Sequence, residues 1–343
     1  MKSASGHPSA TIAGTPSLSS MFDLVNDEMA LVEDWLKSNL IDDNAFVEEL
    51  LKQIFCAGGK RIRPLIVLLS SKATAREVGK LSRLHIILAV LTELIHTASL
   101  VHDDVIDKAS MRRGQETINK KWNDRIAVLM GDLLFAQASI CLARIMNPVV
   151  VGIYGQVLGD LCSGEIKQMR QQFNTTVDWN AYIDKSVSKT ASLFGAGSHS
   201  GAILNGCSND VIQSLKEYGL NLGICFQIVD DLLDITGSTI ETGKAVGSDL
   251  RNGVVTAPAM FVLEKNNEAS ARLKNLIDSR DIQTDEGAEE ALQLIRDNGG
   301  VESTVALAQK YANDSIASLS LLKDSSYKTA LAQLAEYVMT RTT

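Results

Sequence analysis

Apolar residues recur along most of this chain at intervals of three and four positions, with polar residues between them. This period is that of an α-helix that buries one face. The periodic segments are separated by short breaks that contain helix-ending residues, at Gly58-Gly59, Asn147-Pro148, Gly206, Gly237, Gly253, Ala257-Pro258 and Asn298-Gly299-Gly300. No alternation of β-branched and polar residues between turn signals occurs in the sequence. The pattern therefore predicts an all-α fold.

The periodic pattern begins at Met21 and continues toward the C-terminus. Residues 1–20 are instead rich in Ser, Ala, Thr, Gly and Pro and contain no acidic residue. We expect a flexible tail there, either the remnant of a transit peptide or an added leader. No linker rich in proline, glycine or charge divides residues 21–343, which we expect to form a single helical domain.

The composition disfavours membrane spans and nucleic-acid partners. Even the apolar stretch from Leu84 to Ile95 is interrupted by Thr92 and Glu93, so it falls short of the ~18 residues that a membrane span needs. We expect no transmembrane segment and at most peripheral membrane association. The net charge of -8 and the lack of a Lys/Arg-rich run disfavour nucleic acid. The five scattered cysteines indicate reduced thiols in an intracellular compartment.

Two aspartate clusters stand out inside apolar helical sequence, Asp103-Asp104-Val105-Ile106-Asp107 and Asp230-Asp231-Leu232-Leu233-Asp234. Positions i and i+4 of a helix lie on one face, so the outer aspartates of each cluster project together. A single cluster of this kind would most simply be a solvated acidic face. Here both clusters follow apolar residues, and carboxylates crowded into helices built for burial repel one another unless cations are present.

These carboxylates indicate a magnesium site. Hard oxygen ligands, with no cysteine and no histidine pair at ligand spacing beside them, favour Mg²⁺, with Mn²⁺ as a substitute. Mg²⁺ keeps much of its water and bridges a few carboxylates to phosphate oxygens. Two facing clusters would therefore hold a diphosphate between them and make it a better leaving group.

Two compact basic elements indicate a second anion site. In Gly58-Gly59-Lys60-Arg61-Ile62-Arg63-Pro64 a turn enters a helix, where Lys60 and Arg63 are expected to share a face. Arg112 and Arg113 follow the first aspartate cluster and suit phosphate binding. Either element alone would be an ordinary surface feature. Together with two acidic helices, they favour a site for phosphorylated substrates.

The sequence resembles the trans-isoprenyl diphosphate synthases, a family with these motifs in the same order. The resemblance rests on GGKRIRP, SLVHDDVIDKASMRRG, KTASLFGAG, FQIVDDLLD and GKAVGSDLRNGVVTAP. It runs from about Ser19 to the C-terminus. Within the family the chain is most similar to long-chain members of the plant-plastid and cyanobacterial solanesyl type, through SLSSMFDLVNDEM, FCAGGKRIRP, MGDLLFAQAS and SGEIKQ.

The resemblance implies an isoprenoid-synthase helical bundle around a deep central cavity, working as a homodimer on isopentenyl diphosphate and an allylic prenyl diphosphate. It implies metal binding by Asp103, Asp104, Asp107, Asp230 and Asp234, with Asp231 adjacent. It implies binding of the allylic diphosphate by Arg112, Lys189 and Lys244. It implies binding of isopentenyl diphosphate by Lys60, Arg63, His96 and Arg113. The residues expected to act in the chemical step are Asp103, Asp104, Lys189, Thr190 and Gln227.

The sequence departs from the family pattern at one position, because Val254 follows Gly253 where many relatives have lysine. Product length is expected to depend on Ala98 and Ser99, which lie one turn before Asp103. Both side chains are small, whereas short-chain relatives place bulky aromatic residues there to block the growing chain. The resemblance therefore favours a long product.

Several alternatives stay open at this point. A geranylgeranyl or other short- to medium-chain synthase would share the same motifs. A class I terpene cyclase would share the first aspartate cluster, but its second metal motif mixes Asn, Ser or Thr with Glu. A non-catalytic subunit of a heteromeric synthase typically loses one cluster, and this chain keeps both. The resemblance also implies a plastid location if the source is eukaryotic, and the cytoplasm otherwise.

Overall fold

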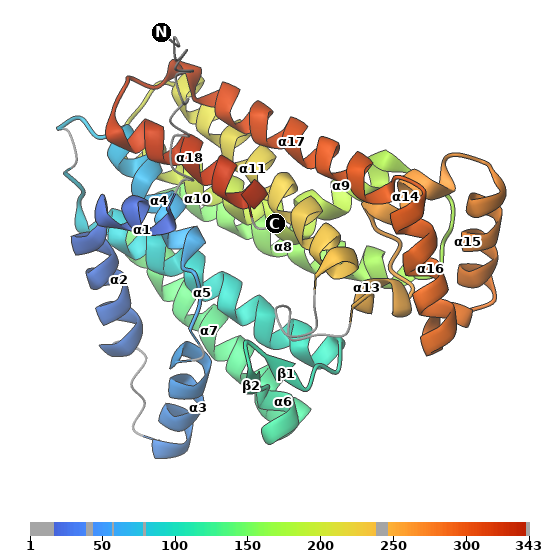
Figure 1. Cartoon of the computed structure of the whole chain (residues 1–343). Coiled ribbons are helices and arrows are strands. Elements are labelled where there is room, and N and C mark those ends of the chain that lie inside the picture. The colour runs from blue at the N-terminus through green and yellow to red at the C-terminus, as the bar shows by residue number, and fades with distance from the viewer. Residues whose placement is uncertain (1–16, 39–43, 57, 78–79, 238–245, 341–343) are drawn as a thin grey trace, which may run out of the picture.

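The computed structural model describes residues 17–38, 44–56, 58–77, 80–237 and 246–340, and these are almost entirely helical (Figure 1). The all-α prediction is confirmed. The α-helices are α1 (Leu18–Asp23), α2 (Asn26–Ser38), α3 (Ala45–Cys56), α4 (Ile62–Ala73), α5 (Arg83–Ile106), α6 (Ile118–Lys121), α7 (Asp124–Ile145), α8 (Pro148–Arg170), α9 (Trp179–Ser186), α10 (Ser192–Leu204), α11 (Asn209–Thr236), α13 (Ser248–Arg251), α14 (Ala257–Leu263), α15 (Glu268–Asp278), α16 (Asp285–Asp297), α17 (Gly300–Ser318) and α18 (Ser326–Thr340). The shorter elements are the antiparallel strands β1 (Met111–Arg112) and β2 (Gln115–Glu116), the π-helical turn η1 (Val187–Ala191), and the 3₁₀ turns η2 (Asp281–Gln283) and η3 (Leu319–Leu321).

The first helix begins earlier than the hydrophobic pattern indicates. Helix α1 starts at Leu18, so the expected boundary at residue 20 falls inside it. Met21 is buried in the core, and α1 lies against the C-terminal helix α18. Residues 1–16, which make up most of the expected tail, lie outside the described residues.

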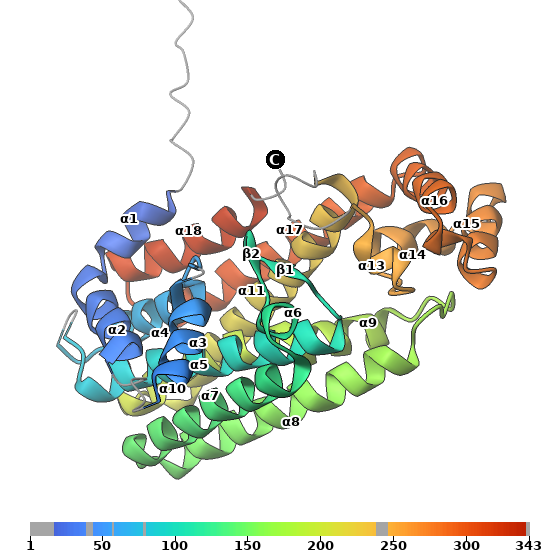
Figure 2. The ribbon, with the colours of Figure 1, turned by 90° about the horizontal axis from the view of Figure 1, so that it is seen from below.

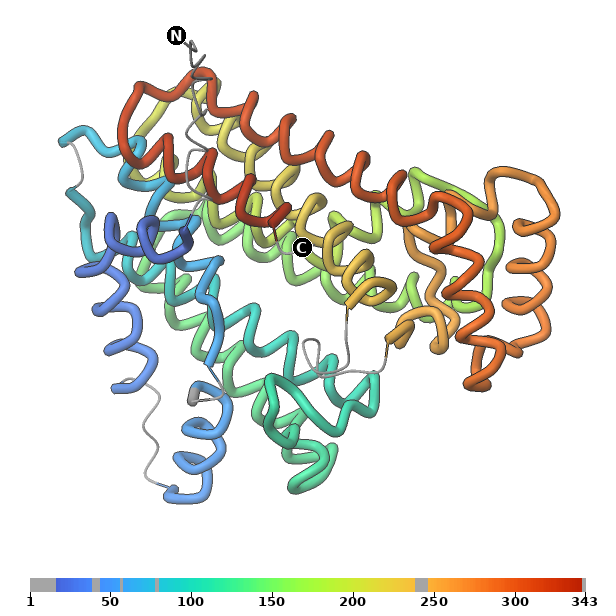
Figure 3. Tube along the Cα trace, viewed as in Figure 1, coloured from blue at the N-terminus to red at the C-terminus, as the bar shows by residue number. Residues whose placement is uncertain are grey.

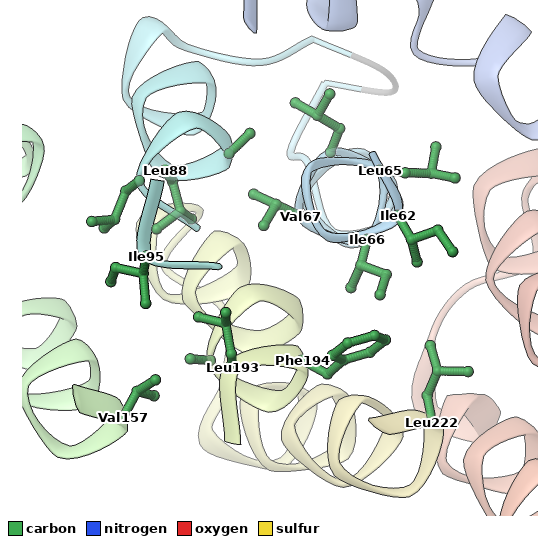
Figure 4. Close-up of a cluster of buried hydrophobic side chains, with 14 of the residues drawn as sticks. Ile62, Leu65, Ile66, Val67, Leu88, Ile95, Val157, Leu193, Phe194 and Leu222 are labelled. Atoms are coloured by element: carbon green, nitrogen blue, oxygen red, sulfur yellow. The ribbon is translucent and has the colours of Figure 1, made fainter. Parts of the chain in front are cut away.

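The core is centred on α4, α5, α10 and α11, and Figure 4 shows part of it. Side chains of Ile62, Leu65, Ile66 and Val67 leave α4 in several directions, because α5, α10 and α18 surround this helix. Phe194 from α10 lies below α4 in the same view. A helix that is apolar on every side is buried on every side. The packing of α4 therefore also fixes the position of Lys60 and Arg61, which lie just before it.

Helices α7 and α8 lie side by side along one outer face of the molecule (Figure 2). Together with α5 they are long and apolar enough to cross a membrane, by length and composition. The prediction that no segment reaches a membrane span is therefore wrong by this criterion, because isolated polar residues such as Thr92 and Glu93 do not outweigh the apolar residues around them. In α5, 67% of the apolar window is buried inside the molecule, against 33% in α7 and 22% in α8.

A second, smaller group of buried residues lies at one end of the bundle, where α14, α15 and α16 pack together (Figure 1). Leu276, Ile277, Leu292 and Ile295 are part of this group. The tube in Figure 3 shows α17 running from α16 at this end back along α11. The long helix α17 therefore joins the smaller group to the main bundle.

A π-helical turn interrupts the run of helix from α9 to α10. Two glycines on neighbouring helices allow the turn to approach closely. A Cβ on Gly164 of α8 would lie 2.6 Å from the Cβ of Ser188, and a Cβ on Gly223 of α11 would lie 2.4 Å from the Cα of Ala191. Single π turns inside helices are frequent at functional sites. This one carries Lys189 and Thr190.

Candidate active site

The first aspartate cluster lies at the C-terminal end of α5. Asp107 caps the helix in a helical conformation, and its backbone N–H donates to the carbonyl of Asp103 at 2.8 Å. The two residues therefore stay one turn apart, as the spacing predicts. Asp104 is only 6% exposed, and its Oδ1 accepts a hydrogen bond of 2.7 Å from Nε of Arg112. This ion pair ties the hairpin β1–β2 to the aspartate helix.

The second aspartate cluster lies in the last two turns of α11 and belongs to a hydrogen-bond chain. Asp231 is 2% exposed, and its carboxylate accepts from the Tyr182 hydroxyl at 2.7 Å and from Gln227 Nε2 at 2.8 Å. Gln227 Oε1 in turn accepts from the Thr190 hydroxyl at 2.7 Å. Burial raises the pKa of Asp231 to about 6. The structure therefore brings together Thr190, Gln227 and Asp231, three of the predicted site residues.

Asp234 turns its carboxylate toward the start of α13. Its two oxygens accept from the backbone N–H groups of Ser248 at 3.0 Å and Asp249 at 3.1 Å. Burial, and next the neighbouring Asp249, raise the pKa of Asp234 to about 7. Lys244, predicted to bind the allylic diphosphate, lies outside the described residues.

Lys189 lies near carboxylates of both aspartate clusters. Its Nζ lies 3.7 Å from Oε2 of Glu165 on α8. Burial lowers the pKa of Lys189, but Glu165, Asp103 and Asp249 offset this effect and the pKa is raised. Burial raises the pKa of Asp103 to about 6, and the charge of Lys189 opposes this rise. Lys189 also lines a small cavity together with Gln227 and Asp231.

The basic turn differs from the sequence prediction. Helix α4 begins at Ile62, preceded by Arg61 in a left-handed conformation at φ 47°. Lys60 lies before the helix, so the prediction that Lys60 and Arg63 share a helical face is wrong. Lys60 is exposed, and its Nζ lies 3.3 Å from the Tyr337 hydroxyl. The guanidinium of Arg63 lies 4.9 Å from the ring centroid of Phe194.

Arg113 joins the turn to the hairpin, and His96 lies among the arginines. Arg113 donates to the carbonyl of Gly58, and a Cβ on Gly59 would lie 2.7 Å from NH1 of Arg113. Burial lowers the pKa of His96 well below its usual value, and the charges of Arg63 and Arg113 lower it further. His96 is therefore neutral at physiological pH, surrounded by cations that suit an anionic ligand.

Sequence reasoning missed Arg61, which lies between two acids. Its Nε donates to Glu33 of α2 at 2.6 Å, and its NH1 donates to Glu93 of α5 at 2.7 Å. The Arg61 side chain is 11% exposed and that of Glu93 is 4% exposed. Arg61 thus holds the turn between Lys60 and Arg63 against two helices. The one signal in the sequence is that Glu93 stands within the apolar stretch from Leu84 to Ile95, where a buried acid needs a basic partner.

A cavity of about 60 Å³ lies between the first aspartate cluster and the hairpin. Its lining includes Asp104, Arg112 and Arg113, so acidic and basic groups border the same space. Within the described ranges, no group of three His, Cys, Asp or Glu side chains is arranged so that it could hold a metal ion by itself.

The residues expected to set product length lie on α5 beside the site. Ala98 is fully buried, and Ser99 is half-buried with its hydroxyl donating to the carbonyl of His96 at 2.9 Å. Further from Asp103 on α5, the hydroxyl of Thr92 lies 2.6 Å from the hydroxyl of Tyr154 on α8, in the core. Tyr154 is among the largest fully buried side chains.

A helical bundle whose aspartate helices meet a lysine on one side and arginines on the other has the architecture of the isoprenoid-synthase class. A family model described as polyprenyl synthetase matches residues 44–295. The chain belongs to this polyprenyl synthetase family.

Individual relatives agree with the family. The chain is 41% identical to solanesyl-diphosphate synthase 2, chloroplastic, of Oryza sativa subsp. japonica, over 95% of this chain and 80% of the relative. It is 41% identical to a prenyl transferase of Synechocystis sp., over 95% of this chain and 99% of the relative. Among solved structures, a polyprenyl synthase from Caulobacter crescentus in complex with calcium and isoprenyl diphosphate has a TM-score of 0.89 at 30% identity, covering 97% of this chain and 100% of that one.

Proposed function

We propose that this protein is a trans-polyprenyl diphosphate synthase that joins isopentenyl diphosphate to an allylic prenyl diphosphate head to tail. One observation carries the proposal, which is that the site offers two differently charged places for a diphosphate. One place is the small cavity that Lys189 lines together with Gln227 and Asp231, and the other is the cavity lined by Arg61, Arg112 and Arg113. A condensation of two diphosphate substrates needs both places side by side.

The acidic place fits a divalent cation, for which we propose Mg²⁺, with Mn²⁺ as a substitute. Its donors are hard carboxylate oxygens from Asp103, Asp104, Asp107, Asp230, Asp231 and Asp234. Both clusters lie near the C-terminal ends of their helices, where the helix dipole is negative. The raised pKa values of Asp103 and Asp234 are those of crowded, desolvated acids, which a cation relieves. When bound, Mg²⁺ would neutralise charge on the diphosphate and so make it a better leaving group.

Residues of the chain would then orient the two substrates. Arg112 and Lys189, with Lys244, would hold the allylic diphosphate. Lys60, Arg63 and Arg113 would hold isopentenyl diphosphate, and neutral His96 would contribute a hydrogen bond rather than a charge.

In the chemical step, the bond between the allylic carbon and the diphosphate oxygen breaks, and the isopentenyl double bond supplies the electrons of the new carbon–carbon bond. A proton then leaves the new chain, and the departing diphosphate would accept it. Positive charge develops on carbon beside the oxygen dipoles of Thr190 and Gln227, whose mutual hydrogen bond fixes their orientation. Positioning and electrostatics thus account for catalysis without a protein nucleophile.

We propose a long-chain product such as solanesyl diphosphate, in line with the names of the plant relatives. Small Ala98 and Ser99 leave room beside the first cluster.

We also propose a homodimer, formed through α7 and α8. Their exposed large apolar side chains are Val128, Leu129, Ile140, Val149, Val151, Ile166 and Met169. Long apolar helices that are mostly uncovered need another surface, and a second copy covers both helices at once. We place the enzyme inside the cell, in a plastid if the source is eukaryotic and in the cytoplasm otherwise.

The test is to incubate the purified protein with Mg²⁺, labelled isopentenyl diphosphate and allylic primers of increasing length, and then to measure the size of the products. We expect elongated linear prenyl diphosphates. Products no longer than geranylgeranyl diphosphate would favour a short- to medium-chain synthase. Cyclic hydrocarbons would favour a terpene cyclase, and incorporation only after mixing with a partner would favour a non-catalytic subunit.

A further inference from the structure

Two cavities meet at Lys185, on the side of the second aspartate cluster. One of about 130 Å³ lies outside α9, and one of about 30 Å³ lies toward Lys189 and Asp231. Three residues line both cavities: Gln168, Lys185 and Val254. Lys185 therefore stands where an outer polar cavity borders the diphosphate site.

Lys185 lies close to the second aspartate cluster. Its Nζ lies 5.3 Å from the ring centroid of Tyr182, whose hydroxyl donates to Asp231. Within the part of the chain that the structure describes, no carboxylate oxygen lies within 4.0 Å of the Lys185 ammonium. Lys189, in contrast, has Glu165 at 3.7 Å.

Across the cavities, Val254 contributes no charge. Its backbone N–H donates to the carbonyl of Asp249 at 2.9 Å, and the backbone N–H of Asp249 donates to Asp234, so the backbone at residue 254 is held beside the second cluster. A lysine at position 254 would extend into the same space that Lys185 borders, because both positions line both cavities. The two positions are therefore alternative sources of one positive charge.

We infer that Lys185 is a substrate-binding residue, which supplies to the allylic diphosphate the cation that position 254 lacks. Lys185 precedes Lys189 by four residues, and both residues line the cavity next to Asp231, Lys185 from the end of α9 and Lys189 from the π turn. The charge would stabilise the diphosphate as it gains negative charge on leaving. This inference rests on the proposed function for the identity of the ligand.

The test compares Lys185→Gln with the double variant Lys185→Gln/Val254→Lys. Binding of inorganic diphosphate with Mg²⁺ is measured by calorimetry, and KM and kcat are measured for each substrate. We expect Lys185→Gln to weaken diphosphate binding and to lower kcat/KM for the allylic substrate by roughly tenfold or more. KM for isopentenyl diphosphate should change less than about twofold, and the double variant should recover most of the loss.

Lys310→Gln is the matched control, because Lys310 also lies over a tyrosine ring, 5.7 Å from that of Tyr311, but lines neither cavity. It should behave as the wild type. Unchanged diphosphate binding in Lys185→Gln would overturn the inference. The inference would also be overturned if the folded double variant Lys185→Gln/Val254→Lys recovered neither diphosphate binding nor kcat/KM. Lys185 would then act only through its contact with Tyr182. A wild-type protein that elongates no primer would refute the proposed function instead, and the calorimetry would still test Lys185.

Discussion

At the scale of single residues, Arg61 shows how a buried charge can hold a basic turn in place. It pairs with Glu33 and Glu93 while its own backbone is left-handed. Removing one member of a buried pair leaves the other uncompensated, which is far more costly than removing a surface pair. The position of Lys60 and Arg63 therefore depends on an arginine that lies between them in sequence.

Arg61→Gln should lower the free energy of unfolding by about 3 kcal/mol and raise KM for isopentenyl diphosphate more than KM for the allylic substrate. Urea denaturation and steady-state kinetics measure the two effects. Lys80→Gln, which breaks an exposed pair with Glu77, should change stability by less than about 0.5 kcal/mol. Equal losses of stability in Arg61→Gln and Lys80→Gln would contradict the expectation that the buried ion pair contributes more than the exposed one.

Asp103 gives a prediction with a defined pH window. Its pKa in the folded protein is about 6, above the ordinary value of 3.8, so the folded state binds more protons between these values. The wild type therefore loses stability as pH rises through this window. In the presence of a chelator, Asp103→Asn should be more stable than the wild type at pH 8, by about 2 kcal/mol, with no advantage near pH 4. Chemical denaturation at several pH values tests this, and an advantage that is independent of pH would contradict it.

Ser99 gives a prediction about product length. Ser99→Phe places a ring on the half-buried face of α5 beside the first cluster, and it should shorten the products while primer binding persists. Chromatography of the labelled products measures this. Ser110→Phe, at an exposed position beyond the helix, is the control and should leave the distribution unchanged. If Ser99→Phe gave the same distribution of product lengths as Ser110→Phe, Ser99 would not be one of the residues that determine product length.

At the scale of elements, the π turn η1 matters most, because it sets where Lys189 and Thr190 lie. The glycines at 164 and 223 give it the room to approach α8 and α11. The hydrophobic pattern alone did not reveal this turn, because spacings of three and four residues already vary within an ordinary α-helix.

Gly164→Ala should lower kcat by roughly tenfold or more, because its methyl group would displace Ser188 and with it the turn. Gly159→Ala on the same helix is the control, since a Cβ there meets nothing within 4 Å. That control should keep full activity and gain up to about 1 kcal/mol of stability from helix propensity. Full activity in Gly164→Ala would show that the turn tolerates displacement.

The sequence was sufficient for the elements whose signal is local. The helical period predicted the fold, and the spacing of Asp103 and Asp107 predicted their common face. It was insufficient where a residue's role depends on contacts distant in sequence. The left-handed Arg61 moved the start of α4 to Ile62, and the roles of Glu165, Asp249 and Tyr182 depend on packing between helices. Lys185 had no motif of its own.

At the scale of the whole molecule, α7 and α8 form the outer layer through which we propose that two copies assemble. Leu129 on α7 is 66% exposed, and Ile140 on α7 and Ile166 on α8 are exposed apolar residues of the same two helices. Burying that face between two copies would also fix the outer side of the bundle that contains the site.

Leu129→Glu should convert the dimer to monomers, as measured by sedimentation velocity, because each interface would bury two unpaired carboxylates. Leu31→Glu on α2, where Leu31 is 56% exposed, is the control and should remain dimeric. A wild-type protein that is monomeric and binds lipid vesicles would instead assign α7 and α8 to a membrane surface.

The contact between Lys60 and Tyr337 has a consequence for how the enzyme matures during synthesis. Tyr337 belongs to α18, which follows both aspartate helices in the sequence and also covers α4 and α1. A nascent chain can therefore form both aspartate helices while the turn at Lys60 still lacks the support of α18. Under the proposed function, a chain that has not yet reached α18 would bind an allylic primer but elongate it poorly.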